Sequence, residues 1–342
     1  MSDVTFRNAA QRQRRIRALT PFAVLLVMAI LIIGVSTISG APVSSFTVFN
    51  TFQNAATLGL LALAVGLTVI AGEFDLSSIA MFTLGGILAV KFGETQPIFG
   101  IGLALLAGLA VGLLQGFIIV ATGISSVPLT LGTYIILSGL NHIVAGEAIL
   151  AYANYDVGLW LDSIILIVLS PRSLIVLGLF AIVWLAMRFS RFGPALRATG
   201  ADRRAALASG ISVPGTIMIV FVLSGLLCAL GGALFAYSTT AAKYDIGLDP
   251  FIFAVTAVLI GGVAMDGGRG SALGILLGVL AMSALDTFFL QLALPTFLVD
   301  LARGALLLIV VLIEAPDLAR KLTAWRNRRA SRTIPLDPST QA

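Results

Sequence analysis

Long apolar runs, separated by short turns rich in glycine and polar residues, dominate the chain. Three stretches, residues 18–72, 95–146 and 205–242, contain no Asp, Glu, Lys or Arg. Because a helix crosses the bilayer core with about 20 apolar residues, these stretches are long enough for two, two and one to two crossings. The pattern predicts an all-α fold and a polytopic membrane protein.

The apolar runs and the turn residues between them predict about ten transmembrane helices. The predicted spans cover residues 20–38, 52–71, 76–91, 98–121, 128–146, 166–188, 214–236, 250–265, 271–290 and 296–313. Pro171 and Arg172 interrupt the sixth run, so residues 163–188 form either one kinked span or a span plus an interfacial segment. The first run is longer than the about 7–15 apolar residues of a signal peptide, which favours an uncleaved span.

Composition narrows the class of protein. Of the 342 residues, 58% are hydrophobic and 11% are charged, whereas a soluble domain has about 25% charged residues. The sequence contains one cysteine, Cys228, and one histidine, His142. This excludes an intramolecular disulfide and a metal site built on cysteine or on clustered histidines, so no metal is expected.

The basic residues predict the orientation in the membrane. Most of them lie ahead of the first span, in the loop 190–214, at Arg269 and in the C-terminal tail. The positive-inside rule places these segments, and hence both termini, in the cytoplasm. The predicted organisation is a basic N-terminal segment (1–19), a transmembrane domain (20–314) and a basic tail (315–342). Because the basic residues flank apolar runs and form no stripe on a folded face, no nucleic acid partner is expected.

The longest cytoplasmic loop, residues 190–214, contains a predicted surface helix. Thr199 is a candidate N-cap, Asp202 suits the positive end of a helix, and Gly210 can take the left-handed C′ position. These signals predict one short helix over 200–209.

Two further cytoplasmic loops, 72–78 and 261–271, are rich in small residues. In the first, Asp75 is placed to cap the third span. The second is dense in glycine, but no Gly-x-x-x-x-Gly-Lys-Ser/Thr sequence occurs in the chain, so it is not a phosphate-binding loop. Any ATP hydrolysis must take place on another chain. The two loops resemble each other, and the sequence leaves open whether a duplication lies behind this.

Together, the three loop motifs resemble the ribose-type permease family of ABC importers, over about residues 20–315. The resemblance implies a permease subunit of the bacterial inner membrane that translocates a monosaccharide and is not an enzyme. It implies a homodimer or heterodimer of permeases in membrane lipid, a cytoplasmic ABC ATPase subunit and a periplasmic substrate-binding protein. This chain would hold no cofactor, because ATP and Mg bind to the ATPase.

The resemblance also assigns candidate residues. It makes the loop 190–214 the coupling segment that docks on the ATPase, with the candidates Arg197, Thr199, Gly200, Ala201, Asp202, Ala205, Ala206, Ser209 and Gly210. The cytoplasmic turn motifs contribute Gly72, Asp75, Gly262, Gly267, Gly268 and Gly270.

The fifth span carries four polar residues at helical spacing, namely Thr130, Tyr134, Ser138 and Asn141. They share one helix face, and polar groups on a span normally face the protein interior or water. This face is a candidate lining of the translocation path. The alternative is that these side chains form hydrogen bonds between helices.

Other functions remain as alternatives. Permeases for branched-chain amino acids or nucleosides are distant relatives of the ribose-type family. An ion-coupled secondary transporter would need ionisable groups deep in the spans, and here the acidic residues cluster near span ends. A membrane enzyme would need convergent catalytic groups at mid-depth, which this composition does not provide.

Overall fold

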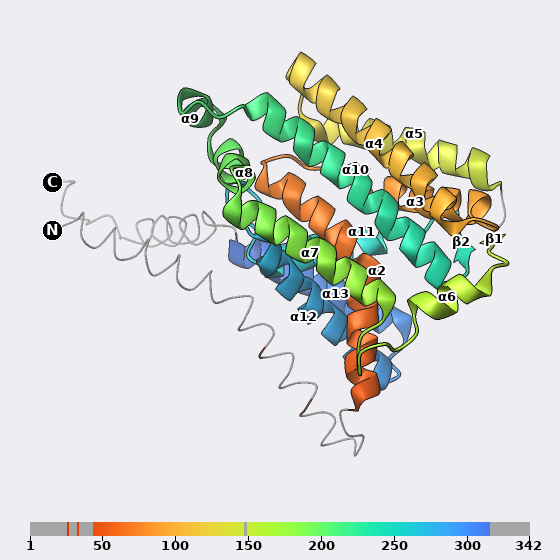
Figure 1. Cartoon of the computed structure of the whole chain (residues 1–342). Coiled ribbons are helices and arrows are strands. Elements are labelled where there is room, and N and C mark those ends of the chain that lie inside the picture. Colours follow the sequence, from red (N-terminus) through yellow and green to blue (C-terminus); the bar gives the residue numbers. More distant parts are fainter. Residues whose placement is uncertain (1–25, 27–32, 34–43, 147–148, 315–342) are drawn as a thin grey trace, which may run out of the picture.

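The computed structural model describes Leu26, Ile33, residues 44–146 and residues 149–314 (Figure 1). The described part contains twelve helices and one pair of short antiparallel strands. In chain order the elements are α2 (Ser45–Ile70), α3 (Ser78–Phe92), α4 (Pro97–Thr122), α5 (Ser126–Ala145), β1 (Leu150–Ala151), α6 (Tyr155–Leu161), α7 (Pro171–Phe189), α8 (Phe192–Ala201), α9 (Arg203–Ala208), α10 (Val213–Ser238), β2 (Ala241–Ala242), α11 (Asp249–Ile260), α12 (Ala272–Gln291) and α13 (Thr296–Glu314).

The helical membrane fold is confirmed. Six of the described helices, α2, α4, α5, α7, α10 and α12, are long and apolar enough to cross a bilayer. Two apolar helices are shorter, α3 with 15 residues and α11 with 12. Apart from Leu26 and Ile33, the predicted first span lies outside the described residues, as do the segments 1–19 and 315–342. Each of the other nine predicted spans overlaps a helix.

The run that contains Pro171 is resolved into two parts. Residues 162–170 are not helical, and α7 begins at Pro171, with Ser170 Oγ accepting a hydrogen bond from the Ser173 amide at 3.2 Å. Proline fits the first turn of a helix because the amide it lacks would have no partner there. The run is therefore one helix preceded by a separate, non-helical segment, and it is not a helix kinked at Pro171. An interfacial place for the preceding segment stays a prediction.

Helix α10 lies at the centre of the bundle and packs on α2, α3 and α4. Its contact with α4 is between backbones: a Cβ added at Gly108 would lie 2.3 Å from the Gly225 carbonyl oxygen, and one added at Gly225 would lie 2.1 Å from that of Gly108. In lipid, helices gain little from hydrophobic association, so such close approach of small residues is a main source of stability.

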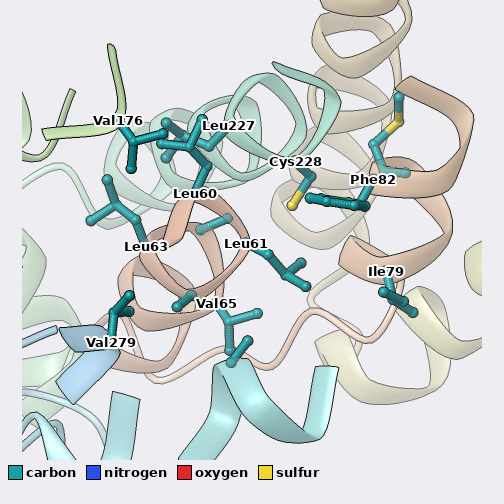
Figure 2. Packing of buried hydrophobic residues seen from close by; sticks show 14 of the residues in the cluster. Leu60, Leu61, Leu63, Val65, Ile79, Phe82, Val176, Leu227, Cys228 and Val279 are labelled. Carbon is teal, nitrogen blue, oxygen red and sulfur yellow. The ribbon is translucent and has the colours of Figure 1, made fainter. Parts of the chain in front are cut away.

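The buried apolar core gathers residues from most of the described helices, and Figure 2 shows a part of it on α2, α3, α7, α10 and α12. Helix α2 contributes the largest share. The residues labelled in Figure 2 are Leu60, Leu61, Leu63, Val65, Ile79, Phe82, Val176, Leu227, Cys228 and Val279. This core separates two ends of the molecule. Helices α8 and α9 lie at one end of α10, and α6, β1 and β2 lie at the other (Figure 1).

Candidate functional site

The three glycine-rich loops meet at one place, which we call the loop junction and define by Gly72, Gly200, Gly267 and Gly268. A Cβ added at Gly200 would lie 2.0 Å from the Ile70 carbonyl oxygen and 2.5 Å from the Gly268 amide nitrogen. A Cβ added at Gly267 would lie 2.8 Å from the Gly72 Cα. The Gly268 amide also donates to the Ile70 carbonyl at 2.9 Å. The end of α8 is thus wedged between the turns that follow α2 and α11.

Both turns are built in the same way. Helix α2 ends with Gly72 at φ +76°, and α11 ends with Gly262 at φ +79°, values that glycine adopts without steric cost. Each glycine amide donates back into its helix at 2.9 Å, to the Val69 and Leu259 carbonyls respectively. The sequence likeness of the two loops therefore corresponds to a shared helix ending.

The loop 190–214 differs from the prediction. Residues 200–209 do not form one helix, because the chain breaks at Asp202 between α8 and α9. Asp202 accepts hydrogen bonds from the Arg204 and Ala205 amides at 2.8 and 3.1 Å, so it caps α9, and Thr199 lies buried inside α8. An aspartate side chain competes for backbone donors and so starts a new helix. The left-handed Gly210 is confirmed at φ +77°.

The remaining coupling candidates fall into two groups. Ala206 is buried with Thr199, whereas Arg197 and Gly200 are half-buried. The others form an exposed surface on and around α9, namely Ala201, Asp202, Ala205, Ser209 and Gly210. This second group offers the most surface to another protein.

An ion pair that the sequence did not indicate joins two of the loops. Arg203 Nη2 donates to Glu73 Oε1 at 2.5 Å, and the Glu73 side chain is 3% exposed while that of Arg203 is 48% exposed. The two residues are 130 positions apart, so local sequence carries no signal for the pair. The pair fastens the first residue of α9 to the turn that follows α2.

Removing one partner should cost more than removing both. Arg203→Gln leaves the buried Glu73 carboxylate without its cation, whereas Glu73→Gln combined with Arg203→Gln leaves no charge unpaired. We expect the single change to lower the stability of the detergent-solubilised protein by about 1 kcal/mol, since Arg203 is half-exposed, and the double change to recover part of it.

Arg204→Gln is the matched control, because Arg204 is an exposed neighbour without an ion pair among the described residues. Thermal unfolding of the unaltered protein, the two single variants Glu73→Gln and Arg203→Gln, and the double variant forms a double-mutant cycle. Arg204→Gln is measured beside it. Strictly additive effects at Glu73 and Arg203 would contradict the pair.

Asp75 is buried at 3% exposure and lies two residues before the N-cap of α3, which is Ser77. The prediction that Asp75 caps α3 is therefore wrong. Its Oδ1 accepts from the amide and the hydroxyl of Ser77 at 3.0 and 2.6 Å, and its Oδ2 accepts from Ser224 Oγ at 2.7 Å. Gln115 Nε2 donates to Ser77 Oγ at 2.8 Å. Asp75 thus connects α3, α4 and α10 beneath the loop junction.

The four polar residues of α5 do not share one environment. Thr130 is buried, donating to the Phe74 carbonyl and accepting from the Leu76 amide, both at 3.1 Å. Asn141 Nδ2 donates to the Ala80 carbonyl of α3 at 3.1 Å. Thr130 and Asn141 therefore agree with the alternative role, in which these side chains form hydrogen bonds to other parts of the bundle. Tyr134 and Ser138 are half-buried, and a lining role stays a prediction for them.

Comparison with known proteins gives consistent matches over this arrangement. Residues 47–311 match the family model described as a branched-chain amino acid transport system, permease component. That range contains the loop junction and every described helix except the ends of α2 and α13. No solved structure matches the chain significantly.

Several curated relatives cover most of both chains. The inner membrane ABC transporter permease protein YjfF of Escherichia coli (strain K12) is 31% identical over 84% of this chain and 88% of its own. The ribose import permease protein of Bacillus subtilis (strain 168) is 29% identical, over 83% and 89%. The L-arabinose ABC transporter permease protein of Azospirillum brasilense is 30% identical, over 75% and 76%. Its relatives include ABC importer permeases, the class of protein that its loop motifs resemble. The chain therefore belongs to the family of permease components of branched-chain amino acid transport systems.

Proposed function

We propose that this chain is the transmembrane permease subunit of an ABC importer for a monosaccharide in a bacterial inner membrane. The observation that supports the proposal is the loop junction, because there the end of α8 packs against the turns that follow α2 and α11. A displacement of α8 and α9 by a partner would be passed to α2 and α11 through backbone contacts. The relatives that are named for a solute include a ribose permease and an L-arabinose permease, which supports a sugar as the solute.

The proposed assembly is the one implied by relationship to ABC importer permeases. A cytoplasmic ABC ATPase docks on the exposed surface of α9 and supplies ATP and Mg, a periplasmic binding protein delivers the solute, and a second permease completes a dimer. Ten spans with both termini in the cytoplasm agree with the distribution of basic residues.

A branched-chain amino acid is the second candidate solute. It is favoured by the description of the matching family model. Because two of the three relatives at 29–31% identity are named for a sugar and none of the three is named for an amino acid, we place the sugar first.

Reconstitution tests the proposal and the docking surface together. The chain is placed in proteoliposomes with its cognate ATPase and binding protein, and uptake of labelled ribose, arabinose and leucine is measured with ATP hydrolysis. Ala205→Arg puts a long charged side chain on the exposed face of α9, so we expect lower co-purification of the ATPase and about ten-fold lower uptake.

Ala153→Arg is the control, since Ala153 is equally exposed but lies at the opposite end of the bundle, beside β1. It should leave the co-purification of the ATPase unchanged. Normal ATPase binding and normal uptake by Ala205→Arg would show that α9 is not the docking surface. Absence of uptake by the unaltered chain would reject the proposed function itself.

A further inference from the structure

A cavity of about 550 Å³ lies in the half of the bundle opposite the loop junction. It is bounded by α2, α3, the last turns of α10 and the segment 239–250, which contains β2. Its volume falls within the range of small-molecule sites, about 300–1,000 Å³. The cavity contains no residue of α8 or α9, so it is distinct from the coupling surface.

Small residues form one wall of this cavity. Where α3 and α10 cross, a Cβ added at Gly232 would lie 3.1 Å from the Gly86 amide nitrogen, and one added at Gly86 would lie 3.0 Å from the Gly232 carbonyl oxygen. Both glycines and Ala236 line the cavity. The two helices thus touch through their backbones, and this contact forms one wall of the cavity.

The lining combines an apolar wall with a few separated polar groups. Leu58 and Phe235 provide apolar surface, and Thr83 and Thr239 provide hydroxyl groups. The hydroxyls donate to the carbonyls of Ile79 and Phe235 on their own helix, at 3.0 and 2.9 Å. Each hydroxyl oxygen therefore keeps a lone pair that can accept a hydrogen bond from a ligand.

Two opposite charges complete the lining. Lys243 and Asp245 are both exposed, and neither forms an ion pair within the part of the chain that the structure describes. The charges sum to zero, so the cavity attracts neither anions nor cations overall. Four polar groups spread over an apolar wall suit a molecule that carries several hydroxyl groups around an apolar ring face. An aliphatic amino acid would use the two charges and the apolar wall and would leave the two hydroxyl groups without a partner.

Resting on the proposed function, we propose that this cavity receives the transported solute, a small neutral polyhydroxylated molecule, on the extracytoplasmic side. The solute enters near β2 after release from the binding protein, and the α3–α10 contact closes the inner end of the cavity. The binding protein sets the affinity of the whole system, so damage to the cavity should change the maximum rate of uptake rather than its half-saturation.

The two short strands offer a matched pair of variants. Ala241 and Ala151 lie directly opposite each other in the β1–β2 pair. Ala241 is half-buried and lines the cavity, whereas Ala151 is exposed and does not. In the reconstituted importer, Ala241→Phe should lower the maximum uptake rate of labelled ribose or arabinose about ten-fold by filling the cavity. ATP hydrolysis stimulated by the binding protein should continue, which shows that the variant is folded and assembled.

Ala151→Phe should transport at the rate of the unaltered chain. Thr239→Phe, at an exposed residue of the lining, is a second variant whose uptake should fall in the same way. Undiminished uptake by both cavity variants, in an importer that does transport the sugar, would overturn the cavity assignment and leave the proposed function intact.

The charged residues test the class of solute. Asp245→Asn and Lys243→Gln keep hydrogen-bonding groups, so uptake of a neutral sugar should fall by no more than about three-fold. Uptake of leucine by the unaltered chain, with loss of that uptake in either variant, would overturn the assignment to a polyhydroxylated solute.

Discussion

Replacing Gly200 by alanine should abolish coupled uptake although it adds a single methyl group. The new Cβ would lie 2.0 Å from the Ile70 carbonyl oxygen and 2.5 Å from the Gly268 amide nitrogen. Both obstacles are backbone atoms, which cannot rotate away as a side chain can. Overpacking of this kind costs about 1–3 kcal/mol, more than the about 0.5–1 kcal/mol that alanine gains over glycine within a helix. The end of α8 should therefore leave the loop junction.

We expect the Gly200→Ala protein to insert normally in the membrane. ATP hydrolysis should no longer drive uptake. The membrane core is untouched, so the chain should still be purified in normal amounts. We expect uptake to fall at least about ten-fold while the ATPase still co-purifies, because α9 keeps its exposed surface.

Gly178→Ala is the matched control. Gly178 also lies inside a helix, α7, but a Cβ there meets no atom within 4 Å. The same substitution should be neutral or slightly stabilising in thermal unfolding and should leave uptake unchanged. Equal behaviour of the two variants would mean that the loop junction has no role in coupling.

The second large effect is expected at Asp75. Asp75→Ala removes the acceptor of three buried hydrogen bonds, from the Ser77 amide, the Ser77 hydroxyl and the Ser224 hydroxyl. Each buried donor left without a partner costs about 1–3 kcal/mol. The hydroxyl groups can partly reorient, so we expect a total loss of about 2–4 kcal/mol in the free energy of unfolding. The measurement is thermal or denaturant unfolding in detergent.

Asp266→Ala provides the comparison, because Asp266 is the acid of the related loop after α11. Asp266 is exposed and has no side-chain hydrogen bond to another described residue. Its removal should change the stability by less than about 0.5 kcal/mol. A loss at Asp75 as small as that at Asp266 would show that the buried network contributes little.

The sequence by itself determined the class of protein, the approximate helices and the three loops that carry glycine. Hydropathy is a local property of the chain, so apolar runs and the glycines between them can be read without a structure. The left-handed Gly72 and Gly210 are local in the same sense, since a helix end needs a residue that tolerates positive φ. The signal for the break at Asp202 is also local. From the sequence, Asp202 is expected at the positive end of a single helix, whereas in the structure its side chain caps a second helix, α9.

Only the tertiary structure decided which of these segments meet. In lipid, the face of a helix that packs on protein and the face that contacts lipid are both apolar, so the pattern of one span does not show its neighbours. Asp75 and Asp266 occupy similar positions in similar loops. Asp75 is buried because it packs against α10, whereas Asp266 is exposed. The Glu73–Arg203 ion pair and the cavity between α3 and α10 exist for the same reason. Each depends on how distant helices approach one another, and that is a property of the folded bundle.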